Sequence, residues 1–270
     1  MNFLARLTYS SKLTRLARSL HLTGALRKMY YRLGARPDGQ VRFTVRDVHA
    51  SFYCRPDPAD FRGLEGNFVT EQDFLDALLS TLRPGDTFYD VGANYGLFSI
   101  FVGKTVGDRG QVVAFEPDSQ TCELLLANER LNQVRSIRLF RKALGEEEKR
   151  EPLFVGGSLV AQEGNLPERG VAEVVDVVPG DRFVSAEKLT IPRAVKIDVE
   201  GFEYSVLRGL AQTLANPACE LLCCEVHPGL LPKGVTADTV KSFVNSLGFS
   251  HLRTHRQNFA DHVIAYKRTH

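Results

Sequence analysis

FYDVGANYGLFSI, residues 88–100, is the stretch that decides the fold of this chain. Its apolar beginning predicts a strand over residues 87–91, and the apolar residues from Leu97 onward predict a helix directly after a glycine turn. A strand, a tight glycine turn and a helix N-terminus in succession bring the backbone close to a bound ligand and direct free N–H groups at it. Asp90 stands at the end of the strand, so we expect its carboxylate to face the same ligand.

The spacing around this turn indicates which ligand is bound. A dinucleotide-binding turn has the pattern G-x-G-x-x-G, whereas here Asn94 occupies the position of the second glycine. Asp90 would repel a nucleotide phosphate but attract a cationic amino-acid head group. Glu116 ends the next strand, 24 positions after Gly92, where an acidic side chain can accept from both hydroxyls of a ribose. The alternative is an ordinary strand–helix turn without a ligand.

These features predict S-adenosylmethionine as the cofactor. The expected cofactor-binding residues are Asp90, Gly92, Ala93, Asn94, Gly96, Glu116, Pro117 and Asp198.

From residue 86 onward, predicted strands and helices alternate, which is typical of a parallel sheet covered on both faces. The expected strands are 87–91, 112–115, 137–140, 194–199 and 220–225, and the expected helices are 97–106, 119–132, 202–214 and 236–247. Residues 249–254 and 262–266 are expected to form an antiparallel pair. A further helix is expected over residues 70–82, with Thr70 as its N-cap. The sequence therefore predicts the α/β class with an antiparallel ending.

A third motif, AVKIDVEGFE at residues 194–203, leads into VLRG at residues 206–209. Together, DVGANYG, AFEPD and VKIDVEGFE…VLRG, in this order, resemble the FkbM family of methyltransferases. The resemblance covers about residues 71–227 and, more loosely, 41–267. It implies the class I methyltransferase fold, with a mostly parallel, Rossmann-like seven-stranded sheet, helices on both faces and an antiparallel last strand. It also implies S-adenosylmethionine-dependent O-methylation of hydroxyls on natural products and glycans. A long loop between residues 156 and 179 departs from the family pattern, so no substrate contacts are carried over there.

Three side chains near strand ends are the candidates for catalysis: Asp198, Glu225 and His227. If the strand order of the family holds, the first, fourth and fifth strands are neighbours, and their carboxyl ends converge around the ligand. Methyl transfer to a hydroxyl needs aligned reactants and an acceptor for the hydroxyl proton. Asp198 is the first choice to face the substrate, with a helix N-cap as its structural alternative. His227 is the alternative base, because its ordinary pKa of about 6.5 suits neutral pH; its structural alternative is a loop histidine bonded to backbone.

The same strand ends permit other interpretations. The side chains that can hold a divalent ion, as in metal-dependent catechol-type methyltransferases, are Asp198, Glu200, Glu225 and His227. Carboxylates at strand ends are equally common around a cofactor and as helix caps, so the preferred interpretation has no metal. Lys196 lies in a strand that should be covered on both faces, and we expect it to pair with a carboxylate such as Glu225 or Asp90 rather than to act in catalysis.

The first 36 residues differ in composition from the rest. They carry eight basic residues and no acidic one, whereas the remaining chain has 26 basic and 32 acidic residues and a net charge of −6. Apolar residues at helical spacing predict two short amphipathic helices in this arm, followed by a methyltransferase domain over residues 37–270. We expect the arm to contact an anionic membrane surface; the alternative is a lid over the active site or a dimer element. Residues 41–45 and 51–54 are expected to form an edge hairpin.

Composition limits the remaining possibilities. The 270 residues, 43% of them hydrophobic, can bury one sizeable core, and no apolar run approaches the roughly 20 residues needed to cross a bilayer. Five cysteines without a C-x-x-C pair predict buried thiols and a cytoplasmic protein. The negative body argues against a nucleic-acid partner, so the expected acceptor is a small molecule or a glycan. The alternatives are an RNA or protein methyltransferase and a cofactor-binding scaffold without catalysis. The oligomeric state is not predicted.

Overall fold

The computed structural model describes residues 39–53, 66, 68–154, 171–257 and 259–267. The chain divides into two compact units, one made of Met1–Thr44 and His49–Thr70 and the other of Val45–Val48 and Glu71–His270. The predicted arm, residues 1–36, lies outside the described residues. Its two helices, and the domain boundary after it, therefore stay predictions.

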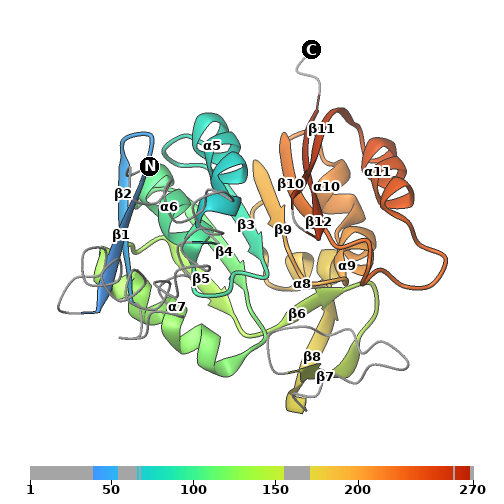
Figure 1. Ribbon diagram of the computed structural model, residues 1–270, viewed down its shortest axis with the longest axis horizontal. Coiled ribbons are helices and arrows are strands. Elements are labelled where there is room, and N and C mark those ends of the chain that lie inside the picture. The colour runs from blue at the N-terminus through green and yellow to red at the C-terminus, as the bar shows by residue number, and fades with distance from the viewer. Residues whose placement is uncertain (1–38, 54–65, 67, 155–170, 258, 268–270) are drawn as a thin grey trace, which may run out of the picture. The chain divides into compact units, whose positions relative to one another are not determined.

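The larger unit is built on a seven-stranded sheet with the strand order β11-β12-β10-β9-β3-β4-β5 (Figure 1). The strands are β3 (Thr87–Val91), β4 (Gln111–Phe115), β5 (Ile137–Phe140), β9 (Ala194–Ile197), β10 (Leu221–Val226), β11 (Phe249–Gln257) and β12 (Ala260–Lys267). Neighbours from β5 to β10 pair in parallel, whereas β12 is antiparallel to both β10 and β11. This confirms the predicted mostly parallel seven-stranded sheet with an antiparallel last strand. The order reverses between β3 and β9, which is where ligands bind in open α/β sheets.

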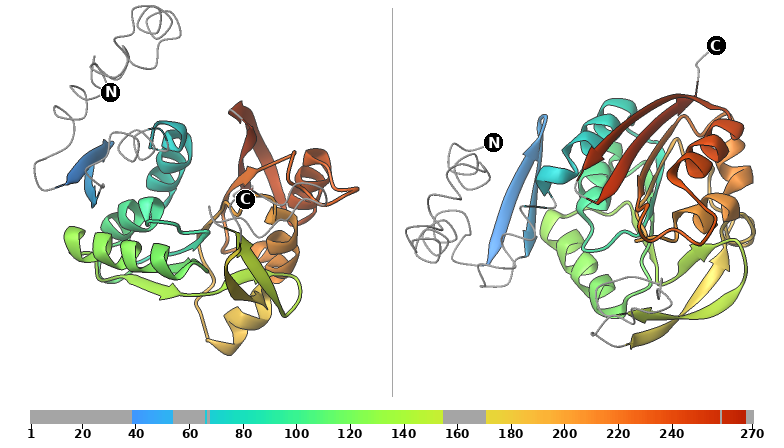
Figure 2. Two further views of the ribbon diagram at one scale, coloured as in Figure 1. Left: turned by 60° about the horizontal axis from the view of Figure 1, so that its bottom comes forward. Right: turned by 45° about the vertical axis from the view of Figure 1, so that its right-hand side comes forward.

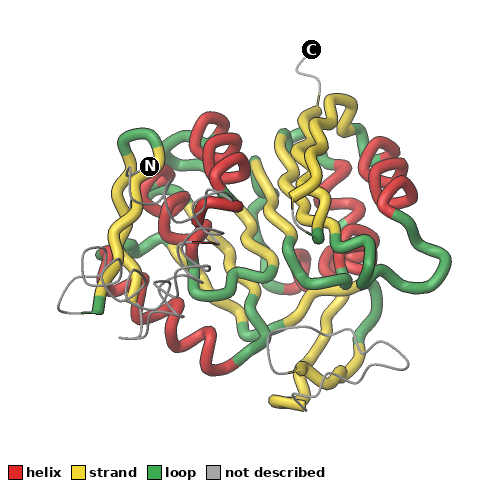
Figure 3. The backbone as a smooth tube through the Cα atoms, in the orientation of Figure 1, coloured by secondary structure: helices red, strands yellow, loops and turns green. Residues whose placement is uncertain are grey.

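Helices alternate with these strands along the chain (Figure 3). They are α5 (Gln72–Thr81), α6 (Leu97–Val106), α7 (Ser119–Asn132), α8 (Gly180–Ala186), α9 (Glu203–Gly209), α10 (Ala211–Ala215) and α11 (Ala237–Ser246). The predicted bounds of α6 and α7 are confirmed. The predicted N-cap of α5 is wrong, because Glu71 occupies that position without a capping side-chain bond. The single helix predicted over residues 202–214 is two helices that meet at Leu210.

Local sequence explains where two of these helices begin. The Asp118 side chain caps α7 by accepting a hydrogen bond from the backbone N–H of Thr121 at 2.6 Å. Thr236 and Thr239 form a reciprocal capping box at the start of α11. Such caps satisfy N–H groups that have no partner within the helix.

The two faces of the sheet bury different kinds of side chain, because alternate strand residues point to opposite faces. On one face, which we call the apolar face, strand residues such as Tyr89 and Ile197 pack against α9, α10 and α11 in a continuous hydrophobic core. Figure 2 shows these helices on one side of the sheet and α5, α6 and α7 on the other. The second face also carries ionisable side chains, among them Asp90, Lys196, Glu225 and His262.

We call this second surface the charged face. Its register places Asp90 beside Lys196 and Glu225 beside His262 on neighbouring strands. Contacts with Ser99 of α6 and with Phe74 of α5 show which helices cover it. The strands therefore bring four ionisable groups together under α5 and α6.

A smaller sheet of order β6-β8-β7 follows β5. Its strands are β6 (Ala143–Gly145), β7 (Lys149–Phe154) and β8 (Val171–Pro179). The sequence predicted a long loop between residues 156 and 179. Within this stretch, residues 171–179 form the strand β8, because they pair with both β7 and β6, and residues 155–170 lie outside the described part of the chain.

The predicted hairpin near the N-terminus is present as β1 (Gln40–Val45) and β2 (Val48–Tyr53). The alternation that predicted it reappears in burial, since Val41, Phe43 and Val45 are buried. The two strands form a sheet of their own rather than an edge of the seven-stranded sheet.

Candidate active site

The glycine turn after β3 has the backbone that its sequence predicts. Gly92 and Gly96 have φ values of +76° and +91°, which only glycine adopts at no steric cost. A Cβ atom on Gly92 would lie 1.9 Å from the carbonyl oxygen of Asp198. Glycine is therefore required here because the turn packs against the end of β9, at the point where the strand order reverses.

The N–H groups of this turn are used within the protein. Those of Gly92 and Ala93 both donate to the carbonyl oxygen of Phe115 at 3.0 Å. That of Asn94 donates to Oε2 of Glu116 at 2.8 Å. The prediction that free N–H groups point at a ligand is therefore wrong for residues 92–94, which instead tie the turn to β4.

Asp90 lies beneath the turn and is fully buried. Its Oδ2 accepts a hydrogen bond from the Ser99 hydroxyl at 2.6 Å, and its Oδ1 lies 3.7 Å from Nζ of Lys196. Burial raises the pKa of Asp90, while Lys196 and Ser99 act in the opposite direction. A direct contact between this carboxylate and a cofactor does not fit this placement, because no part of the side chain is exposed. Through these contacts, Asp90 holds Ser99 at the start of α6 and the ammonium group of Lys196.

Glu116 is placed as predicted, at the carboxyl end of β4. Its Oε1 accepts from the N–H of Asp118 at 2.9 Å, and its Oε2 accepts from the N–H of Asn94 at 2.8 Å. A carboxylate oxygen can accept two hydrogen bonds, so each oxygen retains capacity for a ribose hydroxyl. Burial raises the pKa of Glu116 to about 7. The remaining acceptor capacity of its two oxygens fits the ribose hydroxyls of S-adenosylmethionine. Pro117 follows it and is half-buried.

Lys196 crosses the charged face and pairs with carboxylates, which confirms the predicted structural pairing with Asp90. Its Nζ donates to the carbonyl oxygen of Gly92 at 2.7 Å and lies 3.5 Å from Oδ2 of Asp198. Burial lowers the pKa of Lys196, but the surrounding carboxylates, led by Asp198 and Asp90, outweigh this and raise it to about 12. The charged lysine links the glycine turn to the end of β9.

The three predicted catalytic residues are brought together at the carboxyl ends of β9 and β10. Asp198 retains 27% of its side-chain exposure, and His227 retains 11%. Nε2 of His227 lies 3.9 Å from Oε1 of Glu225 and 3.6 Å from Oε2 of Glu200. We call Asp198, Glu200, Glu225 and His227 the strand-end cluster. Its members are at the carboxyl edge of the sheet, where substrates of α/β enzymes bind.

Glu203 is a member of this site that the sequence analysis missed. It is fully buried, and its Oε1 accepts from the N–H of Gly201 and lies 2.8 Å from Nδ1 of His227. A buried carboxylate at Nδ1 holds the N–H on that nitrogen and directs Nε2 away from it. The only local signal was an acidic residue in the first turn of α9, and its pairing with a histidine 24 residues later depends on the packing of α9 against β10.

The charges of the site depend on burial and on close partners. Burial raises the pKa of Asp198 to about 6, with Lys196 opposing the shift. Burial lowers the pKa of His227, but the hydrogen bond to Glu203 and nearby carboxylates outweigh it and raise the pKa to about 9. For Glu225, burial is outweighed by the hydrogen bond and charge of His262, so its pKa is lowered. Carboxylates therefore dominate this edge of the sheet.

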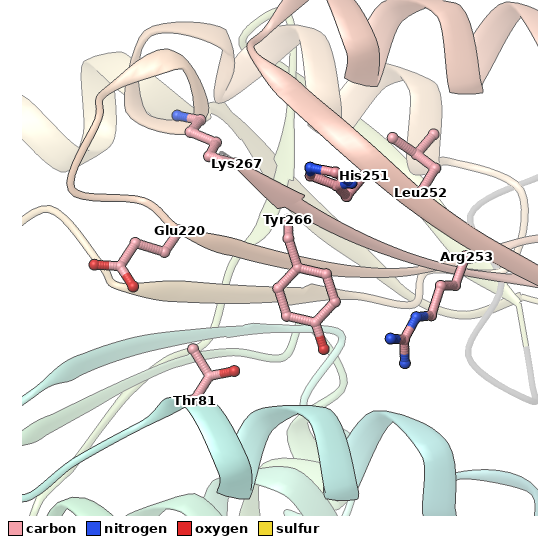
Figure 4. A pocket seen from close by; sticks show the side chains of 7 residues that line it. All are labelled: Thr81, Glu220, His251, Leu252, Arg253, Tyr266 and Lys267. Carbon is pink, nitrogen blue, oxygen red and sulfur yellow. The ribbon is translucent and has the colours of Figure 1, made fainter. Parts of the chain in front are cut away.

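A cavity of about 690 Å³ lies away from this edge (Figure 4). It is lined by Thr81, Glu220, His251, Leu252, Arg253, Tyr266 and Lys267. Glu220 directly precedes β10, whereas His227 directly follows it, so the cavity lies at the opposite end of that strand. The strand order and the chemistry of the side chains locate the candidate active site at the carboxyl edge instead.

The seven-stranded sheet with its antiparallel last strand, the glycine turn after β3 and the acidic residue at the end of β4 place this chain among the class I methyltransferases, which use S-adenosylmethionine. A scan against family models matches residues 90–251 to the Methyltransferase FkbM domain. The chain belongs to the FkbM methyltransferase family.

Two named relatives are similar in sequence. Hexuronic acid methyltransferase AglP from Haloferax volcanii is 29% identical over 201 residues, which cover 73% of this chain and 74% of AglP. Methyltransferase 1 from Beauveria bassiana is 27% identical over 170 residues, or 54% of this chain and 68% of the relative.

Among solved structures, the chain is similar to an rRNA methylase from Streptococcus thermophilus, with a TM-score of 0.47 and 13% identity over 73% of this chain and 96% of the other. A precorrin-6y C5,15-methyltransferase from Geobacter metallireducens gives a TM-score of 0.45 and 15% identity over 74% and 90% of the two chains. The fold assignment rests on the strand order of this protein and not on these likenesses.

Proposed function

We propose that this methyltransferase moves the methyl group of S-adenosylmethionine to a hydroxyl of a sugar, in a glycan or a small glycoside. The observation that carries the proposal is the strand-end cluster, which sets a partly exposed carboxylate, Asp198, directly beside the glycine turn. The relative AglP, whose name states methylation of a hexuronic acid, supports a sugar as the acceptor.

The cofactor supplies a methyl group on a sulfonium, and the protein aligns it with the acceptor and takes up the hydroxyl proton. In one displacement the acceptor oxygen bonds to the methyl carbon, the sulfur–carbon bond breaks, and the proton passes to a base. Asp198 is the proposed base, because its carboxylate remains accessible while Asp90 on the neighbouring strand does not. His227 and Glu225 lie beside it and orient the acceptor. Alignment of this kind contributes about 7–11 kcal/mol, and proton acceptance about 10²–10⁴-fold.

Acceptor screening tests the proposal. The full chain is incubated with methyl-labelled S-adenosylmethionine and neutral hexosides, hexuronosides, catechols, RNA and a protein mixture. We expect label in the glycosides, and loss of label when the accepting hydroxyl is replaced by hydrogen. Label that appears in RNA with a steep salt dependence, or in protein alone, would contradict a sugar acceptor. Tight cofactor binding without transfer to any acceptor would favour the scaffold without catalysis.

The location of the enzyme belongs to the same proposal. The four cysteines that the structure describes are free and buried, which supports the cytoplasm as the compartment. None of the described helices combines the length and hydropathy needed to span a bilayer. We propose that the eight basic residues of the first 36 contact an anionic membrane surface, where each adds about 1 kcal/mol. Sedimentation with anionic liposomes, for the full chain and for a chain starting at Gln40, tests this.

A further inference from the structure

We propose that Asp198, Glu200 and His227 bind a divalent cation of the Mn²⁺ or Mg²⁺ kind. This site goes beyond the proposed function. It shares Asp198, the proposed base, and His227 with that function, but the ion can be measured without cofactor or acceptor. It also replaces the preferred interpretation of the sequence, in which no metal was expected. Four observations support it: the ligand spacing, the orientation of the histidine, the chemistry of the donors and the balance of charge.

The spacing of the donor atoms fits a shared ion better than direct pairing. One nitrogen or oxygen from each of Asp198, Glu200 and His227 lies within 4.8 Å of the others. With metal–ligand bonds of about 2.1 Å in an octahedral site, adjacent ligands are about 3 Å apart and opposite ligands about 4.2 Å apart. The 3.6 Å between Nε2 of His227 and Oε2 of Glu200 falls in this range. By contrast, the hydrogen-bonded pair of His227 and Glu203 closes to 2.8 Å.

The histidine is held in the orientation of a metal ligand. His227 is 9% exposed, and its Nδ1 faces the buried carboxylate of Glu203. Its Nε2 points toward Glu200 and Glu225 at 3.6 and 3.9 Å, within the range of an ion pair but beyond a hydrogen bond. A divalent ion would take the place of the proton on this nitrogen. Metal-bound histidines almost always donate their other ring N–H to a carboxylate or carbonyl. Glu203 supplies this second contact.

Donor chemistry and charge select the kind of ion. Two carboxylates suit Mg²⁺ or Mn²⁺, and one imidazole favours a transition metal, so Mn²⁺ satisfies both preferences. Glu225 lies 3.9 Å from the same imidazole nitrogen and adds a further negative charge. Lys196 is the buried cation nearest to Asp198, and it is also engaged by the backbone of Gly92. A divalent ion would offset the remaining carboxylates.

A second group of possible ligands lies nearby but is less suited to an ion. It consists of Glu71, Glu225 and His262. Glu225 and His262 already contact each other at 3.2 Å, and Glu71 and His262 are buried. The more open group, in which Glu200 is exposed, can be reached from solvent.

Binding of Mn²⁺ to the full chain tests the site directly. The protein is treated with EDTA, dialysed and titrated with Mn²⁺ without cofactor or acceptor, and free Mn²⁺ is counted by electron paramagnetic resonance. We expect one ion per chain, displaced by excess Mg²⁺. Glu200→Gln and His227→Gln should each weaken binding at least tenfold, and Glu203→Gln should weaken it about 10- to 100-fold through the histidine. The control is Glu147→Gln, which changes an exposed carboxylate on the same chain.

Each outcome decides the proposal. Glu200→Gln alters a side chain that is 49% exposed, so it keeps the test valid if the histidine variant does not fold. Failure of the parent to bind Mn²⁺ at millimolar concentration would overturn the site. So would equal binding by the parent and Glu200→Gln, which would place the ion elsewhere. If the protein binds one ion but methylates no sugar, the cation site is supported and only the proposed function is contradicted.

Discussion

The apolar face and the charged face of the sheet are built from the same strands but meet different demands. The apolar face buries hydrophobic side chains against α9, α10 and α11 and needs nothing beyond close packing. The charged face buries Asp90 and Lys196 in the same strands. Burying charges costs free energy unless they are paired and hydrogen-bonded. Apolar residues on the charged face would complete the core at a lower cost in free energy. The buried charges therefore indicate that this face serves the site at its carboxyl edge.

The contrast also runs along the charged face itself. Beneath the glycine turn, Asp90 is fully buried, accepts a hydrogen bond from Ser99 and pairs with Lys196. Beyond the strand ends, Asp198 keeps part of its surface and has carboxylates as neighbours. The first group holds the turn in place, and the second is left for ligands.

The largest expected effect comes from breaking the buried charge pair. Lys196→Met leaves the Asp90 carboxylate buried without its cation, which should lower the free energy of unfolding by about 3–5 kcal/mol. Urea denaturation followed by circular dichroism measures it. Ile197→Val is the matched control on the apolar face and should cost only about 0.5–1.5 kcal/mol.

A second variant sharpens this result. Asp90→Asn combined with Lys196→Met removes both charges, so it should recover part of the loss. If Lys196→Met were no less stable than Ile197→Val, the pair would not hold the turn, and the two faces would be energetically equivalent.

The next effect concerns the exposed part of the charged face. Asp198→Asn should lower kcat by about 10²-fold or more, or about 2.7 kcal/mol of activation free energy. Because the buried pair remains, the unfolding midpoint should change little. Asp108→Asn, in an exposed turn, is the control. Turnover equal to that of the parent would remove Asp198 from the reaction.

Sequence predicted the parts of this site that depend on local pattern. The strand–turn–helix at residues 88–100 and the acidic end of β4 follow from apolar runs, glycine and spacing. Whether Asp90 faces a ligand or the interior depends on the packing of α6, which the pattern of β3 does not contain. The pairing of Glu225 with His262 needed the register of β10 and β12. The contact of Glu203 with His227 joins two elements that are adjacent only in the folded chain.

A smaller effect is expected at the ribose-binding carboxylate. Glu116→Ala removes the acceptor for the ribose hydroxyls, and loss of a charge-assisted hydrogen bond costs about 1.5–3 kcal/mol. Cofactor affinity should therefore fall about 10- to 150-fold, as measured by calorimetry on folded protein. Asp90→Asn should weaken binding less, because its carboxylate is buried beneath the turn. A larger loss of cofactor affinity for Asp90→Asn than for Glu116→Ala would contradict the assignment of Asp90 to support of the turn and of Glu116 to contact with the ligand.

The smallest effect is a pH dependence at the same residue. Burial raises the pKa of Glu116 to about 7, and its charged neighbours, Lys196 and Asp118, act on it in opposite directions. If the ionised form accepts the ribose hydroxyls, cofactor affinity should fall about tenfold between pH 8 and pH 6, as the ionised fraction falls. Unfolding of the protein at low pH does not explain this fall in cofactor affinity. The pKa of Glu116 is raised in the folded state, so protonation of Glu116 below pH 7 stabilises the folded protein. Glu116→Gln does not titrate and should bind weakly with the same affinity at both pH values. A parent enzyme whose affinity is flat over this range would show that the ribose contact does not need the charge.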